Sequence, residues 1–81
     1  MHVIGGTAST ALGERVSRRL GDAPFAIPFL KRFPDGEMYL RVGGRMEGDD
    51  VVIVQSTRTD GDFLELLLLE DAVREAGARR L

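Results

Sequence analysis

The sequence contains no cysteine and no tryptophan, and it has a single histidine, His2. Without cysteine it cannot form a disulfide framework or a zinc site built on thiolates. No apolar run approaches the roughly 20 residues that a membrane-spanning helix requires. The most apolar stretch, residues 63–69, is interrupted by Glu65. The 11 basic residues do not exceed the 13 acidic ones, so the bulk positive charge of many nucleic-acid-binding proteins is missing.

The N-terminus lacks the features of a secretory signal, because its apolar run is short and no basic residue precedes it. We therefore expect a cytoplasmic protein that binds neither nucleic acid nor membrane. His2 has no obvious partner, and we expect neither catalysis nor metal binding from it. With one histidine and no cysteine, the residues offer no nucleophile–base pair. The 81 residues are enough for one small domain, and 43% hydrophobic residues are typical of a globular one.

Strands and helices alternate along the chain. Residues 2–4 form a β-branched run that ends at two glycines, and residues 51–54 (VVIV) are typical of a parallel strand buried on both faces. A helix with one apolar face is expected from about residue 8 to residue 20, capped by Thr7 or Ser9. The residues of that apolar face are Ala8, Ala11, Leu12, Val16 and Leu20.

A second helix is expected over residues 63–76, with Asp60 or Asp62 as its cap. Its leucines surround it, which predicts burial on more than one side, whereas Glu65 is expected at a solvated position. The chain ends in Ala-Arg-Arg-Leu, and Leu81 resembles the first residue of a following strand. We expect the sequence to be cut there, because a crossover helix normally packs back onto its sheet through a further strand.

Two further runs indicate a hairpin-like excursion. Residues 25–30 are apolar and predict a strand confined to an edge by its prolines, and residues 38–42 alternate as a strand does. Between them, residues 31–37 (KRFPDGE) form a polar turn with one aromatic side chain, two cations and two carboxylates. The aromatic ring suits a purine base and the carboxylates suit its ribose, but an ordinary Pro-Asp-Gly turn also explains these residues.

Two other loops follow strands and are weaker candidates. Residues 5–9 (GGTAS) lie where a helix N-terminus could bind an anion, although they match no phosphate-loop motif. Residues 55–58 (QSTR) follow a buried strand, at the edge where open α/β sheets bind ligands. A glycine turn with a capping hydroxyl is the simpler explanation of the first loop, and a solvated loop is the simpler explanation of the second.

In this order the segments resemble the ribose-phosphate diphosphokinases, also called phosphoribosyl pyrophosphate synthetases. The resemblance rests on GGTAS, KRFPDGEMYLRV, DVVIVQST and LELLLLEDAVREAGARRL, and it covers essentially all 81 residues. The Arg-Phe-Pro-Asp-Gly-Glu string followed by an alternating strand is its most distinctive part. The compact loops are more similar to archaeal and some bacterial members than to animal ones.

The resemblance implies an α/β fold of the type I phosphoribosyltransferase kind, a parallel sheet with flanking helices and a β-hairpin excursion. Residues 1–81 would be an incomplete N-terminal portion of the N-terminal domain. The family transfers the diphosphoryl group of ATP to the 1-hydroxyl of ribose 5-phosphate, giving phosphoribosyl pyrophosphate and AMP, with Mg²⁺. Its catalytic residues and metal ligands would lie beyond Leu81, so the resemblance implies no catalytic residue in this fragment, which we expect to be inactive alone.

The resemblance also assigns an ATP-binding site to the polar turn. In the family this loop reaches into the active site of a neighbouring subunit of a homo-oligomer. Carried over by position, Phe33 would stack on adenine, Asp35 and Glu37 would make polar contacts to the nucleotide, and Gly36 would permit the turn. Three alternatives remain: a non-catalytic, associated regulatory subunit of the same family, an unrelated nucleotide-binding module, and a phosphoribosyltransferase. The last is disfavoured because those enzymes lack the Asp-Gly-Glu excursion.

Overall fold

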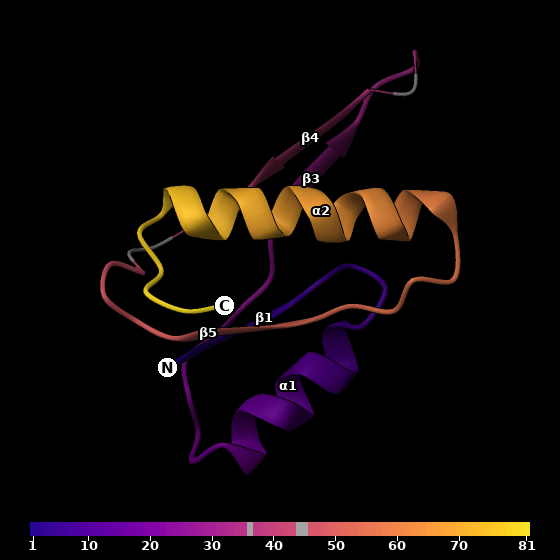
Figure 1. The fold of residues 1–81 in the computed structure, drawn as a ribbon. Coiled ribbons are helices and arrows are strands. Elements are labelled where there is room, and N and C mark those ends of the chain that lie inside the picture. Colours follow the sequence, from indigo (N-terminus) through magenta and orange to yellow (C-terminus); the bar gives the residue numbers. More distant parts are fainter. Residues whose placement is uncertain (36, 44–45) are drawn as a thin grey trace.

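A three-stranded parallel sheet lies between two helices, and an antiparallel hairpin projects from it (Figure 1). The computed structural model describes residues 1–35, 37–43 and 46–81. The described elements are β1 (His2–Gly5), α1 (Thr10–Arg19), β2 (Phe25–Ala26), β3 (Phe29–Arg32), β4 (Met38–Arg41), β5 (Val51–Val54) and α2 (Asp60–Glu75). This arrangement confirms the predicted α/β class with its hairpin excursion.

The strand order β2-β1-β5 explains why the helices lie on opposite faces of the sheet. From β1 the chain passes through α1 to β2, which is next to β1 at one edge of the sheet. From β5 the chain passes through α2 to Arg80, which pairs with Asp50 in a parallel bridge at the other edge. Since parallel crossovers are right-handed, crossovers in opposite directions place their helices on opposite faces, as Figure 1 shows.

The hydrophobic core lies between α2 and the sheet. Ile4, Leu69 and Val73 are fully buried there, together with Met46 and Val51. Leu40 and Val42 pack against the same cluster, so the base of the hairpin is anchored in the core. Among the described residues, no helix is long and apolar enough to cross a membrane.

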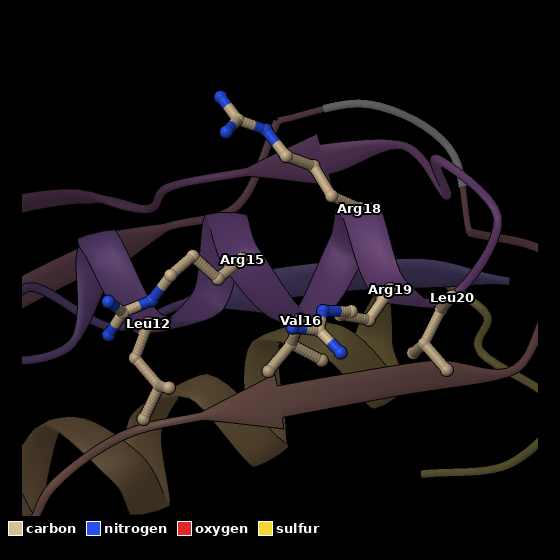
Figure 2. Close-up of a pocket in the computed structure, with 6 residues that line it drawn as sticks. All are labelled: Leu12, Arg15, Val16, Arg18, Arg19 and Leu20. Carbon is tan, nitrogen blue, oxygen red and sulfur yellow. The ribbon is translucent and has the colours of Figure 1, made fainter.

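The predicted apolar face of α1 is not its buried face. The helix buries Gly13 and Ser17, whereas Leu12 and Leu20 are nearly half exposed. Small residues are required on the buried face because α1 lies close to β1, and a Cβ on Gly13 would be 2.9 Å from the Gly5 Cα. Figure 2 shows Leu12, Val16 and Leu20 together along one side of α1, where they line a shallow hollow with arginines.

The predicted strand over residues 25–30 is divided between two sheets. β2 pairs in parallel with β1, and β3 begins the antiparallel hairpin with β4. The buried Pro28 lies between them and has no N–H to donate to either sheet.

The predicted helix caps are also corrected. Thr59 caps α2, since its side chain accepts a hydrogen bond from the Asp62 N–H at 3.1 Å, so α2 begins three residues earlier than expected. Ser9 holds the N-cap position of α1, but its hydroxyl makes no capping bond because it binds Ser56 instead.

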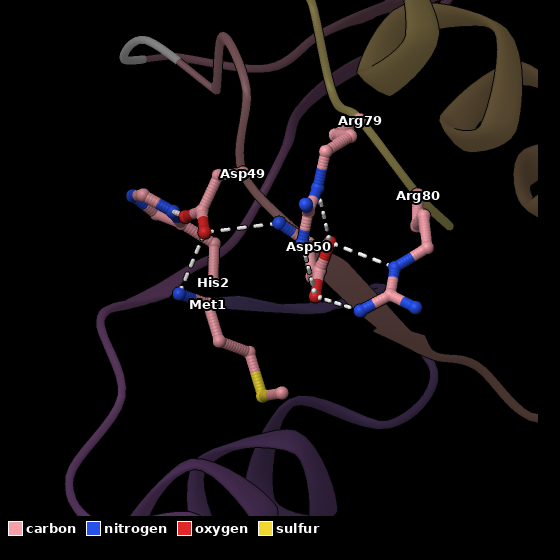
Figure 3. Close-up of polar contacts among 6 residues, drawn as sticks. All are labelled: Met1, His2, Asp49, Asp50, Arg79 and Arg80. Carbon is pink, nitrogen blue, oxygen red and sulfur yellow. Dashed lines mark hydrogen bonds and ion pairs between the residues drawn. The ribbon is translucent and has the colours of Figure 1, made fainter.

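Two aspartates before β5 bind the two ends of the chain (Figure 3). Asp49 accepts from the Met1 amino group at 2.7 Å and from His2 Nδ1, so His2 has the partner that the sequence did not reveal. The amino group and then His2 hold the pKa of Asp49 below its usual value. Asp50 accepts hydrogen bonds from Arg79 and Arg80, and Arg80 is the main reason that its pKa falls to about 2.

Replacing Asp50 by asparagine should therefore remove a pH-dependent part of the stability. The folded-state pKa of Asp50 lies below the ordinary value of 3.8, so its contribution is present above that value and is lost as the pH falls toward about 2. We expect Asp50→Asn to be destabilised relative to the parent near neutral pH, with the difference shrinking over this range. Chemical unfolding as a function of pH measures it, with Asp71→Asn as control, and a pH-independent difference would contradict the assignment.

Candidate functional site

The β3–β4 hairpin has one face turned to the domain and one face exposed. Phe29 pairs with Arg41, Leu30 with Leu40, and Lys31 with Tyr39. Because side chains alternate along a strand, Leu30 and Leu40 share the half-buried face that packs toward the core. The opposite face, carrying Phe29, Lys31, Tyr39 and Arg41, is exposed. The hairpin is therefore held at its base and free along one side.

Aromatic rings and cations alternate on the exposed face. The Phe29 and Tyr39 rings meet edge to face with centroids 6.4 Å apart, and the Arg41 guanidinium lies 5.4 Å from the Phe29 centroid. Lys31 Nζ lies 5.2 Å from the centroid of Phe33, whose side chain follows β3 and is 40% exposed. These contacts order the exposed face without burying the Phe33 ring.

The turn of the hairpin brings together three of the four predicted ATP-binding residues. The Phe33 N–H donates to the Glu37 carbonyl at 2.8 Å, and the Glu37 N–H donates to Asp35 Oδ1 at 3.1 Å. Phe33, Asp35 and Glu37 are all exposed, whereas Gly36 lies outside the described residues. The site thus offers an aromatic ring for stacking and carboxylate oxygens that accept hydrogen bonds from hydroxyl or amino groups. Figure 1 shows that this hairpin extends away from the sheet and helices.

The two other candidate loops are bonded to each other. These are the β1–α1 loop (residues 6–9) and the β5–α2 loop (residues 55–59), which follow neighbouring parallel strands. Ser9 Oγ accepts from the Ser56 N–H at 2.8 Å, and the Ala8 N–H donates to Gln55 Oε1 at 3.3 Å. A Cβ on Gly6 would be only 2.1 Å from the same Gln55 oxygen, so glycine admits this side chain. Much of the polar capacity expected for ligands is therefore used internally.

Glu65 is a buried carboxylate that the sequence prediction placed wrongly in solvent. Its side chain is fully buried, and it accepts from the Thr7 N–H at 2.7 Å and from the Thr7 hydroxyl at 2.5 Å. The signal was that Glu65, Leu69 and Val73, the buried residues of α2, follow one another at intervals of four residues. In the described part of the chain, no three histidine, aspartate or glutamate side chains are grouped so that they could hold a metal ion.

Comparisons with known proteins agree with the fold. The chain is 50% identical over 76 residues to a ribose-phosphate pyrophosphokinase of Methanosarcina acetivorans, covering 94% of this chain and 26% of the relative. It is 41% identical over 83 residues to that of the bacterium Maricaulis maris, again covering 26% of the relative. The chain thus spans about a quarter of the length of these relatives.

A solved purine phosphoribosyltransferase from Pyrococcus horikoshii Ot3 has the same fold. It superposes with a TM-score of 0.78 at 24% identity, covering 98% of this chain and 54% of that one. The match confirms the predicted phosphoribosyltransferase-like architecture and shows the fold alone. The model of the N-terminal domain of ribose phosphate pyrophosphokinase matches residues 1–81. The chain therefore belongs to the family of ribose phosphate pyrophosphokinase N-terminal domains.

Proposed function

We propose that this chain supplies the adenine-nucleotide contacts of a ribose-phosphate diphosphokinase. The complete protein would transfer the diphosphoryl group of ATP to the 1-hydroxyl of ribose 5-phosphate, releasing AMP and phosphoribosyl pyrophosphate. The family supports this reaction, and so do the names of the relatives. The structural observation that carries the proposal is the hairpin turn, which presents an exposed aromatic ring beside two exposed carboxylates.

Each residue of the turn has a distinct proposed role. Phe33 stacks on adenine, which either replaces Lys31 over the ring or uses its opposite face. Asp35 and Glu37 accept hydrogen bonds from the ribose hydroxyls or the adenine amino group, while Gly36 permits the turn. Because Asp35 Oδ1 already accepts from the Glu37 N–H, the turn is partly ordered before a nucleotide binds.

The proposed ATP site is shared between the subunits of a homo-oligomer. The projecting hairpin supports this proposal, because its turn lies away from the sheet of its own domain (Figure 1). The Mg²⁺ that the family implies would neutralise phosphate charge during transfer. The described residues do not fit a set of magnesium ligands, so we expect these ligands and the ribose 5-phosphate site elsewhere in the complete protein. The isolated fragment would then be inactive. The names of the relatives do not favour a regulatory subunit.

Alanine at Asp35 and at Glu37 in the complete protein should weaken ATP binding selectively. A hydrogen bond to a charged group contributes roughly 1.5–3 kcal/mol, so we expect the KM for ATP to rise about tenfold or more for each variant. The KM for ribose 5-phosphate should change little, because neither carboxylate is proposed to touch it. Steady-state kinetics with each substrate varied in turn measures the difference.

Asp71→Ala is the matched control, since Asp71 is an exposed aspartate on α2, away from the hairpin turn. Its two KM values should equal those of the parent. Equal increases in both KM values for the Asp35 and Glu37 variants would contradict the assignment of the turn to ATP. Failure of the parent to form phosphoribosyl pyrophosphate would instead contradict the proposed reaction.

A further inference from the structure

The buried carboxylate of Glu65, on α2, binds the loop that precedes α1. The two helices lie on opposite faces of the sheet. The carboxylate reaches the β1–α1 loop, where both of its oxygens accept from Thr7, one from the backbone N–H and one from the hydroxyl. Thr7 precedes the N-cap residue Ser9 by two positions. Backbone N–H groups at this end of a helix favour negative charge, because the helix dipole is positive there.

The burial of Glu65 requires an explanation, because a carboxylate removed from water is costly unless it is paired. Within the described part of the chain Glu65 makes no ion pair. Its compensation in the structure is the pair of donors on Thr7. A neutral side chain of the same shape would lose one of the two contacts unless the Thr7 hydroxyl reversed its direction, since an amide offers a single accepting oxygen.

The position of Thr7 affects the neighbouring loop as well. Two residues later, Ser9 Oγ accepts from the Ser56 N–H and contacts the Ser56 hydroxyl at 2.9 Å. Gln55 lies over Gly6 and donates from Nε2 to the Asp62 carbonyl at 3.4 Å, at the start of α2. Together with the contact between Glu65 and Thr7, these hydrogen bonds connect the loops that follow β1 and β5 to each other and to the start of α2.

We propose that Glu65 is a positioning residue whose buried carboxylate serves as an internal acceptor for the β1–α1 loop. It accepts both donors that Thr7 offers and so fixes this loop against the β5–α2 loop. Two donors of the candidate loop at residues 5–9 are consequently satisfied by the protein itself. This inference concerns the resting structure and stands whether or not the proposed reaction is correct.

Chemical rescue tests this role in the complete protein. Glu65→Ala removes the carboxylate and leaves space for acetate, which matches the missing end of the side chain. In sodium chloride we expect the melting temperature of Glu65→Ala to fall by several degrees. At equal ionic strength, about 100 mM acetate should recover part of the loss, because a ligand that binds only the folded state stabilises it. Acetamide, which has the same shape without charge, should recover less.

Hydrogen exchange of Glu65→Gln provides a second measurement, which does not require the folded protein to tolerate a cavity at residue 65. Residues 6–9 should exchange faster than in the parent, because the amide either accepts from only one of the two Thr7 donors or requires the Thr7 hydroxyl to reverse its direction. The matched control is Glu70→Gln, a half-buried glutamate on the same helix, which should leave this loop unchanged. Acetate no better than acetamide or chloride, or unchanged exchange in Glu65→Gln, would overturn the proposal.

Discussion

Replacing Gly13 by alanine should destabilise the domain, although the same change stabilises most helices. Alanine in a helix interior is favoured over glycine by about 1 kcal/mol. At Gly13 the added Cβ would lie 2.9 Å from the Gly5 Cα and 2.9 Å from a ring carbon of Phe25. The Phe25 ring has some freedom to move, but Gly5 is backbone at the centre of the sheet, so α1 must shift away from β1. Overpacking of this kind costs roughly 1–3 kcal/mol, which exceeds the helix gain at the upper end of the range.

We therefore expect a net loss of up to about 2 kcal/mol in the free energy of unfolding of Gly13→Ala. Denaturant unfolding of the complete protein, monitored by a probe in this domain, measures it. Gly43→Ala is the matched control, because Gly43 is exposed and a Cβ there would meet no atom of the described residues within 4 Å. A Gly13→Ala variant as stable as the control would show that α1 does not lie as close to β1 as the structure has it.

Replacing Phe33 by alanine should weaken the binding of ATP strongly. Stacking between a base and an aromatic side chain contributes roughly 1–3 kcal/mol per base, so the loss of the ring should raise the KM for ATP about five- to 150-fold. The KM for ribose 5-phosphate should remain close to that of the parent, because the ring is proposed to touch only adenine. Phe33 is exposed, so the protein should fold as well without this ring as with it.

Two further variants distinguish stacking from a general effect on the hairpin. Phe33→Tyr keeps an aromatic ring and should retain most of the ATP affinity. Phe33→Leu keeps the apolar volume without a π-face, and its ATP affinity should fall as that of Phe33→Ala does. Phe29→Ala removes an exposed ring from the same hairpin near its base and should change the KM for ATP much less. A Phe33→Leu variant with the ATP affinity of the parent would contradict stacking on adenine.

The sequence predicted those features that short-range chemistry determines. The apolar residues of β5 predicted a parallel strand, and the two glycines at positions 5 and 6 predicted the end of β1. The parallel pairing of β1 with β5 confirms both strands. The Pro-Asp-Gly turn between alternating residues located the hairpin. The same turn brings Phe33, Asp35 and Glu37 together, although their role in binding ATP stays a prediction.

The features that the sequence did not predict depend on long-range packing. The leucines of α1 suggested its buried face, but the close approach of α1 to β1 instead requires Gly13 there. The carboxylate of Glu65 suggested solvent, but Thr7, 58 residues earlier in the chain, provides the two donors that permit its burial. His2 gained a partner in the same way, from Asp49, which lies just before β5 and beside the start of β1. None of these partners is adjacent in sequence, so local patterns could not identify them.

Photo-crosslinking tests directly whether the hairpin turn contacts the adenine of ATP. The complete protein would be irradiated with an azido-adenine analogue of ATP, with and without excess ATP, and the labelled peptides would be identified by mass spectrometry. We expect the label to fall on the hairpin peptide containing Phe33, and we expect excess ATP to prevent this labelling. Specific labelling that ATP prevents elsewhere in the protein, with none on this hairpin, would contradict the assignment of the turn to adenine.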